Sequence, residues 1–496
     1  MKIKYYLTSV ALMAAFGLTI AACSDENDDK ENDTEINGGG NSDNNNDSET
    51  PNQTIKEIFG EIEGSLTAGR YFVSNHLVIP QGKSLILEPG VELIFTTKGV
   101  GSNHVPVEFS VKGNLYSMGT AEKPVLMTIP EEERTAENIF QEDHQWGGIM
   151  AYKTCNEMLI DHTVIEYTGG QVIEGSPAAA AGEYVAGDDA YPHITTTNPD
   201  GRYVITNSTI RYGWSDGIYM MGGKAIIAHN TFAANGFDGA EAVNIKAGCQ
   251  VDVAGNIMYA PNTNGLKLSS GGQGENGKTQ GKIKAYNNTI LNSGWRRDGE
   301  KGGCIYAEKN VLADVFNNML INCKYRAQTA GWKDPNNIDE GYDTHSTIDY
   351  NCYVSGNQKS DVIWAGEEND EGKWEAGSGI AFAWEGYNTK HKNYHLEDKT
   401  LEDGTVVPAI DAHSVIATEQ NLPNPGFVNY DINTAKMSLV AYNEAWDFHV
   451  QHVIPGAYNG NDAFAQPYYL NDGLNVNGQT FKSPAVQPFF GAYGTK

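Results

Sequence analysis

One short pattern recurs six times between residues 204 and 353, and it restricts this chain to a repeating architecture. In each copy, two short runs rich in β-branched and apolar residues flank a polar anchor, and a turn and a third apolar run follow. A repeat period of roughly 20 to 50 residues is typical of solenoids and other stacked arrays. The anchors, separated by 22, 26, 32, 30 and 33 residues, are Ser208, Asn230, Asn256, Asn288, Asn318 and Asn351.

The repeat predicts an all-β chain folded as a right-handed parallel β-helix, with three strands in each coil. No copy has room for a helix of ordinary length, and the apolar runs have the length of strands. One coil cannot bury its apolar face alone, so its stability must come from the coils stacked on it. Asparagine suits the corner between two strands because it tolerates left-handed backbone angles. Asparagines stacked in register can also form hydrogen bonds along their column.

Residues 1–22 have the features of a signal peptide for export. Lys2 and Lys4 precede a mostly apolar stretch over residues 5–20, and Ile20-Ala-Ala-Cys23 places small residues at the cleavage position. This ending resembles a bacterial lipobox, which implies cleavage before Cys23 and attachment of lipid to that cysteine. The alternative is an ordinary signal peptide followed by an incidental cysteine. No later apolar run is long enough to span a bilayer.

Residues 23–56 form an acidic segment that we expect to be a disordered tether. Residues 24–50 contain ten acidic residues and one lysine, and hardly any apolar side chain that folding could bury. The segment Cys23-Ser-Asp-Glu-Asn-Asp-Asp-Lys30 resembles the acidic tag of Bacteroidetes surface lipoproteins. The resemblance implies a lipid-anchored protein on the exterior of the outer membrane. The net charge of −29 argues against a nucleic-acid partner and favours solubility.

Residues 57–496 resemble the pectin-lyase-like β-helix proteins common in Bacteroidetes. The resemblance rests on Glu88-Pro-Gly90 and Trp146-Gly-Gly-Ile149 near its start, and on Asn424-Pro-Gly-Phe-Val428 and Phe490-Gly-Ala-Tyr493 near its end. It implies one β-helix domain, which we expect to be monomeric, although one fold hosts many functions.

Two stretches interrupt the repeat, near residues 171–202 and near residues 365–409. The first contains a run of alanines, and the second is rich in Glu, Gly, Lys and Trp. We predict that both leave the solenoid as long loops. Loops of this length are either functional or disordered, and both alternatives stay open at this point.

The family resemblance also implies where a site lies, because enzymes of this fold use the first strand of each coil and the turn before it. Strand residues expected to face outward are Tyr219, Asn244, Lys267 and Tyr306, and those expected to face inward are Ile218, Val243, Leu266 and Ile305. The ligand-binding candidates in the turns are Trp214, Phe237, Trp295, Arg297, Tyr325 and Arg326.

These candidates predict a platform for sugars, because aromatic rings stack on pyranose faces and arginine binds carboxylates or sulfates with two parallel hydrogen bonds. We therefore expect the partner to be an extracellular polysaccharide. The alternative is that the aromatic side chains only seal one turn against the next, with solvated charges around them.

Catalysis along the same groove is the second hypothesis, as a polysaccharide lyase or a glycoside hydrolase. In lyases of this fold a Lys or Arg acts as base, often with calcium-bound carboxylates, which implies Lys267 or Arg296 as base here. The implied calcium ligands are Asp216, Asp238 and Glu241, and Asp238 is also a catalytic candidate, although no compact Asp-rich motif is present. Hydrolysis requires two carboxylates at a set separation. A third hypothesis is a structural surface protein without a sugar ligand.

Other signals are weaker. Gly213-Trp-Ser-Asp-Gly217 fits a hydrolase motif but lies in a solenoid turn rather than at a strand-to-helix elbow. Asp411, His413 and Ser414 are too close in sequence to converge as a triad. Five cysteines follow Cys23 and cannot all pair, so we expect buried free thiols at Cys155, Cys249, Cys304, Cys323 and Cys352.

Overall fold

A computed structural model describes residues 55–141, 144–237, 239–329, 340–388, 397–434 and 436–496. These residues belong to one compact unit, Gln53–Lys496. The signal peptide, Cys23 and nearly all of the tether expected over residues 23–56 lie outside the described residues. Within the described ranges, no helix combines the length and the apolar character needed to cross a membrane.

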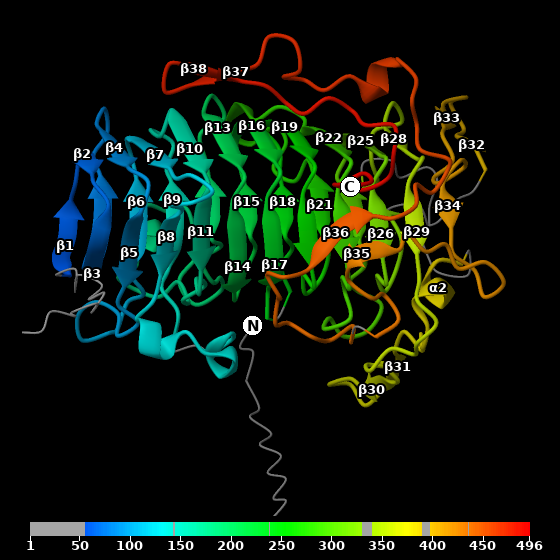
Figure 1. The fold of residues 1–496 in the computed structure, drawn as a ribbon, viewed down its shortest axis with the longest axis horizontal. Coiled ribbons are helices and arrows are strands. Elements are labelled where there is room, and N and C mark those ends of the chain that lie inside the picture. Colours follow the sequence, from blue (N-terminus) through cyan, green and yellow to red (C-terminus); the bar gives the residue numbers. More distant parts are fainter. Residues whose placement is uncertain (1–54, 142–143, 238, 330–339, 389–396, 435) are drawn as a thin grey trace, which may run out of the picture. The chain divides into compact units, whose positions relative to one another are not determined.

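The chain is nearly all β, and its strands recur in groups of three that form three columns of parallel strands (Figure 1). Each strand pairs in parallel with the strand at the same place in the next group, as β15, β18 and β21 do. The first column contains β6 (Glu108–Val111), β9 (Gly148–Ala151), β12 (Ile194–Thr196), β15 (Ile218–Met220), β18 (Val243–Ile245), β21 (Leu266–Ser269), β24 (Ile305–Glu308) and β27 (Gln328–Thr329).

The second column forms a sheet of ten strands. It contains β2 (Gly64–Leu66), β4 (Ser84–Leu87), β7 (Asn114–Met118), β10 (Glu157–Asp161), β13 (Arg202–Thr206), β16 (Gly223–Ala228), β19 (Cys249–Ala254), β22 (Lys282–Tyr286), β25 (Leu312–Phe316) and β28 (Thr347–Ile348).

The third column joins the first at the N-terminal end. It contains β5 (Val91–Phe95), β8 (Val125–Thr128), β11 (Thr163–Glu166), β14 (Thr209–Gly213), β17 (Thr231–Asn235), β20 (Ile257–Tyr259), β23 (Thr289–Leu291), β26 (Met319–Ile321), β29 (Cys352–Val354) and β34 (Val415–Ile416). The long β3 (Gly69–Ile79), which also pairs with β1 (Lys56–Glu61), pairs with β5 through its first half and with β6 through its second. The first and third columns, together with β1 and β3, make one 20-stranded sheet. This arrangement is consistent with a parallel β-helix.

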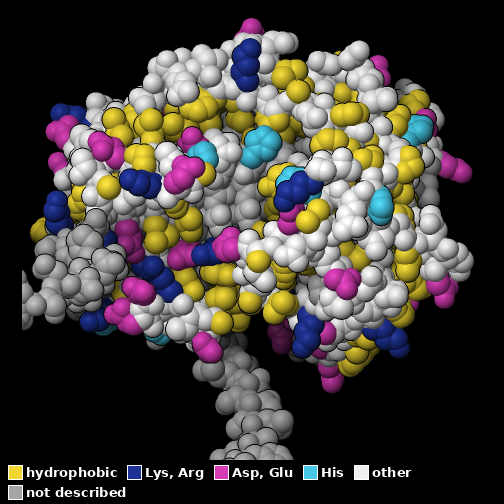
Figure 2. Space-filling model, in the orientation of Figure 1, with side chains coloured by type: hydrophobic (Ala, Val, Ile, Leu, Met, Phe, Trp, Pro, Cys, Tyr) yellow, Lys and Arg dark blue, Asp and Glu magenta, His cyan; other side chains and the backbone are white. Residues whose placement is uncertain are grey.

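The core lies between the columns because alternate residues of each strand point inward. In the first column, Ile218, Val243, Leu266 and Ile305 are fully buried, as the alternation predicts. All five cysteines in the described part of the chain are buried and free, which confirms the expectation of free thiols. On the face drawn in Figure 2, acidic and basic side chains are interspersed among apolar ones rather than gathered by charge.

A ladder of buried asparagines runs along the corner between the second and third columns. The ladder contains Asn230, Asn256, Asn288, Asn318 and Asn351. From Asn256 onward, Oδ1 of each ladder asparagine accepts hydrogen bonds from the backbone N–H and from Nδ2 of the preceding asparagine. Between Asn256 and Asn288 these bonds are 3.1 and 2.9 Å long. Nδ2 also donates to a carbonyl of the coil before, as from Asn288 to the Val253 oxygen at 2.9 Å. The ladder therefore satisfies its buried polar groups only when successive coils are in register.

Hydroxyl groups continue the ladder at both ends. The backbone N–H of Ser208 donates to Oδ1 of Asn230 at 3.0 Å, and Ser208 Oγ accepts from the Thr163 N–H at 3.0 Å. At the other end, the Asn351 N–H donates to Ser414 Oγ at 2.9 Å. Ser414 is thus engaged as the last rung of this column rather than as a nucleophile.

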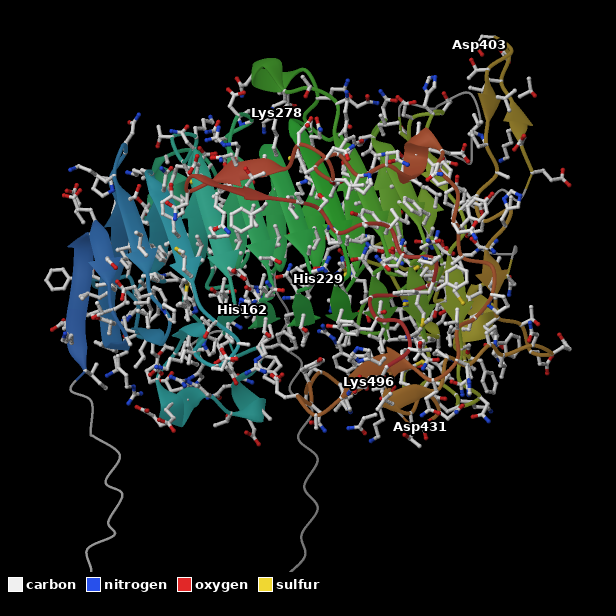
Figure 3. All side chains as sticks on the ribbon, turned by 45° about the horizontal axis from the view of Figure 1, so that its top comes forward. His162, His229, Lys278, Asp403, Asp431 and Lys496 are labelled. Atoms are coloured by element: carbon white, nitrogen blue, oxygen red, sulfur yellow. The ribbon has the colours of Figure 1, made fainter. Side chains whose placement is uncertain are left out.

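The left-handed residue at each corner is the one before the anchor, so the expectation that the anchors themselves adopt such angles is wrong. His229, for example, has φ 59°, whereas Asn230 is not among the residues with positive φ. Figure 3 marks His162 and His229 on this row of corners. Each of the six anchors is directly preceded by a residue with positive φ. These residues are Asn207, His229, Gly255, Asn287, Asn317 and Tyr350.

The first insertion is shorter than residues 171–202, because Ile194–Thr196 forms β12 of the first column. It contains the short helix α1 (Pro177–Ala180) and its own buried cluster of Val172, Ala178 and Tyr191. The loop between β8 and β9 contains the 3-10 turns η1 (Glu131–Glu133) and η2 (Ala136–Asn138). A further 3-10 turn, η4 (Glu275–Gly277), follows β21.

The second insertion contains two antiparallel hairpins and a short helix, and residues 389–396 of it lie outside the described residues. The hairpins are β30 (Gly366–Glu368) with β31 (Trp374–Ala376) and β32 (Lys399–Thr400) with β33 (Val406–Val407), and the helix is α2 (Ala383–Gly386).

After β34 the chain leaves the three columns. It forms the hairpin of β35 (Phe427–Asn429) with β36 (Asp447–Val450), then η5 (Ala463–Ala465) and the hairpin of β37 (Leu474–Val476) with β38 (Gln479–Phe481). Residues 451–496 run back across the second column (Figure 1), where Tyr469 and Val476 join a buried cluster with Val204. Asp252 of β19 accepts hydrogen bonds from the Tyr469 N–H at 3.0 Å and from Ser483 Oγ at 2.6 Å. This segment therefore covers the second column.

We expect Asn288→Ala to lower the free energy of unfolding by about 2–4 kcal/mol, because it removes the acceptor of two buried N–H groups of Asn256. Urea denaturation followed by circular dichroism measures this loss. Asn475→Ala, at an exposed position of β37, is the control and should change stability by less than about 0.5 kcal/mol. Equal stability of the two variants would contradict the role given to the ladder.

Candidate functional site

Four outward residues of the first column form one row, which we call the polar row: Tyr219, Asn244, Lys267 and Tyr306. They are directly paired from strand to strand along β15, β18, β21 and β24. Tyr219, Lys267 and Tyr306 are half-buried, and Asn244 is 5% exposed. The residues on either side of each of the four are fully buried. Strand alternation therefore places the polar row as the sequence predicts.

Two lysines lie over the rings of the polar row. Lys246 Nζ is 5.5 Å from the centre of the Tyr219 ring, and Lys267 Nζ is 5.9 Å from that of Tyr306. Lys267 Nζ also lies 3.7 Å from Oε1 of Glu308. Burial, followed by the like charge of Lys267, lowers the pKa of Lys246. The ammonium groups of Lys246 and Lys267 thus lie on neighbouring coils, the first beside the polar row and the second within it.

The first insertion closes the N-terminal end of this face. Glu108 of β6 is fully buried beneath it and accepts hydrogen bonds from the Tyr191 hydroxyl at 2.7 Å and from the Ala178 N–H at 2.9 Å. Tyr184 reaches further along the face, and its hydroxyl lies 2.8 Å from Oγ1 of Thr195 in β12. The face beyond Thr195, beginning at Tyr219, is left to the polar row.

A pair of buried carboxyl groups, Asp216 and Glu241, lies in the turns before the polar row. Oδ1 of Asp216 accepts a hydrogen bond from the Glu241 N–H at 2.7 Å. Nδ2 of Asn244 donates to Glu241 Oε2 at 3.2 Å and to Asp216 Oδ2 at 3.4 Å. Burial, followed by the like charge of Glu241, raises the pKa of Asp216 far above its usual value. Burial and the neighbouring Glu241 carboxyl group therefore favour the protonated form of Asp216.

This pair does not fit a calcium site. Glu241 Oε1 accepts a hydrogen bond from Asn264 Nδ2 at 3.1 Å, so all four carboxyl oxygens of the pair already accept N–H donors. In the part of the chain that the structure describes, no three His, Cys, Asp or Glu side chains converge to hold a metal. Calcium requires six to eight oxygen ligands. The third expected ligand, Asp238, lies outside the described residues.

Three aromatic side chains and one arginine form what we call the aromatic corner: Phe140, Trp214, Phe237 and Arg296. The Trp214 and Phe237 rings are 4.2 Å apart between centroids, and those of Phe237 and Phe140 are 5.7 Å apart. The Phe237 side chain is 47% exposed, and Trp214 and Phe140 are half-buried. The corner therefore presents ring surface to solvent directly beside the turn that holds Asp216.

The guanidinium of Arg296 holds the aromatic corner together. It lies 4.9 Å from the centre of the Phe140 ring and donates to the Gly236 oxygen at 2.7 Å and to the Ala260 oxygen at 2.9 Å. Burial lowers its pKa to about 10, so Arg296 remains charged at neutral pH. This environment favours positioning over the role of base that the family resemblance implied.

The expected exposure of Trp295, Tyr325 and Arg326 is wrong, because each of these side chains is at most 3% exposed. Trp295 Nε1 donates to the Asn322 oxygen at 2.6 Å, and Arg326 Nε lies 3.9 Å from Oδ2 of Asp411. The second insertion covers these turns.

The contact that fixes this cover is a hydrogen bond of 2.9 Å from the Cys323 N–H to the Tyr387 hydroxyl. Gly386, at the end of α2, also packs directly against the Lys324 carbonyl oxygen. Of the six ligand-binding candidates, Trp214 and Phe237 come together, and half-buried Arg297 lies near Gly239. Lys267 lies apart from them in the polar row.

Phe140 is the residue of the aromatic corner that the sequence analysis missed. It belongs to the loop between β8 and β9, which shares no repeat spacing with the turns of Trp214 and Phe237. No sequence signal pointed to it.

Comparisons of the chain with protein-family models, with curated proteins and with solved structures found no match.

We expect Asp216→Asn to raise the free energy of unfolding above that of the unmodified chain, by an amount that grows as pH rises. The folded pKa of Asp216 exceeds that of an unfolded aspartate, about 3.9. The folded chain therefore binds more protons above about pH 4 and loses stability as pH rises toward the folded pKa. Asparagine removes this loss and can still donate to Glu241. The gain over the unmodified chain should grow by about 1.4 kcal/mol for each pH unit in that window.

Urea denaturation at about pH 4, 6 and 8 measures this gain. Asp472→Asn, at an exposed position, is the matched control and should show a constant difference. A constant difference for Asp216→Asn as well would mean that the carboxyl pair holds no extra proton.

Proposed function

We propose that the chain is a right-handed parallel β-helix of the pectin-lyase-like type that binds an extracellular glycan along the aromatic corner and the polar row. The parallel pairing of strands in groups of three supports the fold. The lipobox-like Ile20-Ala-Ala-Cys23 and the acidic segment after it support a lipoprotein tethered to the exterior of the outer membrane.

The observation that carries the binding proposal is the solvent-facing aromatic corner next to a row of polar side chains. Carbohydrate ligands have apolar ring faces and polar edges, so they need ring surface and hydrogen-bonding groups within one site. Phe237 and Trp214 offer the ring surface, and Tyr219, Lys267 and Tyr306 offer hydroxyl and ammonium groups. A chain of sugars can follow the row because the row runs from coil to coil.

The aromatic corner is also held in place before any ligand arrives. Arg296 donates hydrogen bonds to two backbone carbonyls and lies over the Phe140 ring, which fixes the ring cluster to the turns beneath it. A site that is ordered in advance loses less conformational entropy on binding. Pre-organisation therefore favours a binding role over a sealing role for these rings.

A polysaccharide lyase is the second candidate, and the carboxyl pair favours it. Asp216 and Glu241 lie beside Tyr219, whose pKa is raised by burial and then by Asp216. Lys246, whose pKa is lowered by burial, lies over the same ring. Groups whose pKa is shifted toward neutrality, as burial shifts those of Asp216 and Lys246, suit proton transfer. Carboxyl groups in direct contact are closer than the roughly 5–9.5 Å of glycosidases, which disfavours a hydrolase.

We expect Trp214→Ala with Phe237→Ala to weaken binding of the captured polysaccharide by at least about tenfold, because exposed aromatic anchors dominate such interfaces. Affinity electrophoresis of the lipid-free chain against a panel of acidic and neutral polysaccharides measures this loss. Trp374→Ala removes a 67% exposed ring from β31 and is the matched control. Equal retardation of both variants and the unmodified chain would contradict the proposal that the aromatic corner binds the polysaccharide.

If the second candidate is correct, the lipid-free chain should release unsaturated oligosaccharides from an acidic polysaccharide, and mass spectrometry should detect them. Lys267→Ala, which removes an ammonium group from the polar row, should lower their yield by at least about tenfold. Saturated fragments would indicate a hydrolase instead. The absence of any cleavage would favour the binding hypothesis and the structural hypothesis over the lyase.

A further inference from the structure

The outward row of the first column does not begin at Tyr219. In the parallel pairing, Tyr219 is opposite Thr195 of β12, Thr195 is opposite Met150 of β9, and Met150 is opposite Ser110 of β6. These three earlier side chains hold the same outward position, yet each is at most 1% exposed, whereas Tyr219 is half-buried. The row is therefore covered on its N-terminal side, and the cover ends between Thr195 and Tyr219.

Tyr184 of the first insertion forms the edge of this cover. Its hydroxyl lies 2.8 Å from Oγ1 of Thr195, and its ring meets the Tyr191 ring edge-on with centroids 6.2 Å apart. Tyr191 is held in turn by its hydrogen bond of 2.7 Å to buried Glu108. Burial, and to a smaller extent the neighbouring Tyr219, raises the pKa of Tyr184. Tyr184 thus stands between the covered part of the row and its first exposed residue.

The first insertion is a folded unit rather than an open loop. Its two ends are joined by an antiparallel bridge between Gln171 and Ala190, and the Val172 N–H donates to the Asp189 oxygen at 2.8 Å. Val172 also belongs to the buried cluster inside the insertion. Segments with buried apolar contacts and internal hydrogen bonds resist local opening. The insertion is therefore a fixed wall for any ligand that lies along the row.

We propose that this wall makes the glycan site a chain-end site, in which the last sugar of the polysaccharide lies against Tyr184 and the other sugars continue along Tyr219, Lys267 and Tyr306. A polysaccharide bound through its middle needs an open path on both sides, and the buried row up to Thr195 offers none. Tyr184 is then the residue that sets the preference for chain ends. The inference rests on the proposed function for the position of the site and for its ligand class.

The test counts protein molecules on each polysaccharide molecule. Lipid-free protein, residues 24–496, is added in excess to size fractions of the unbranched polysaccharide that retards it most in affinity electrophoresis, with alginate and hyaluronan among those compared. Sedimentation velocity then gives the mass of each saturated complex. We expect one protein molecule on each polysaccharide molecule at every length, because an unbranched polysaccharide has only one end of each kind.

A shortened insertion should remove this limit. Replacing residues 173–188 with Asn-Gly joins Val172 to Asp189 through a two-residue hairpin turn and removes Tyr184. The number of bound protein molecules should then rise with the length of the polysaccharide. Tyr184→Ala should raise the number at least about twofold on the longest fraction, which covers the case of a shortened variant that does not fold. Glu174→Ala, at an exposed position of the same insertion, is the matched control and should still bind one to one.

The outcomes separate this inference from the proposed function. For the unmodified protein, a number that rises with polysaccharide length would overturn the chain-end site and leave glycan binding intact. One-to-one binding that persists in both Tyr184→Ala and the folded shortened variant would also overturn it, because the insertion would not be what closes the site. Failure to bind any polysaccharide would overturn the proposed function and this inference together.

Discussion

The asparagine ladder is the constraint on which the rest of the structure depends. Its amides are buried, and those of Asn230, Asn256, Asn288 and Asn318 are each satisfied by the asparagine of the next coil and by a carbonyl of the coil before, as Asn288 shows. A slip of one residue would leave these groups unpaired and would also turn every strand's apolar face outward. The ladder thus fixes the register of all three columns, and that register places Tyr219, Asn244, Lys267 and Tyr306 in one row.

The ladder also explains where the chain can vary. In the five coils from β13 to β26, two residues separate the strand of the second column from that of the third, at positions 207–208, 229–230, 255–256, 287–288 and 317–318. The turns from the third column to the first are free of this constraint and differ in length, and the first insertion is one of them. Functional groups accumulate in such loops because a rigid scaffold tolerates change there. The aromatic corner and the carboxyl pair both draw on these turns.

Repetition determines which features could be read from the sequence. The six anchors predicted the stacked parallel strands, and strand alternation predicted the polar row, because both follow from local spacing. The burial of Trp295 and Tyr325 did not follow, because it depends on the second insertion folding back over distant turns. Phe140 lies in a loop without repeat spacing, so only the three-dimensional packing brings it to Phe237.

The most direct test of the central claim is a crystal structure of residues 57–496 with an oligosaccharide cut from the polysaccharide that the chain captures. Sugar rings should stack on Trp214 or Phe237, with the chain of sugars continuing along Tyr219 and Lys267. An oligosaccharide bound elsewhere, with the aromatic corner and the polar row both empty, would contradict it.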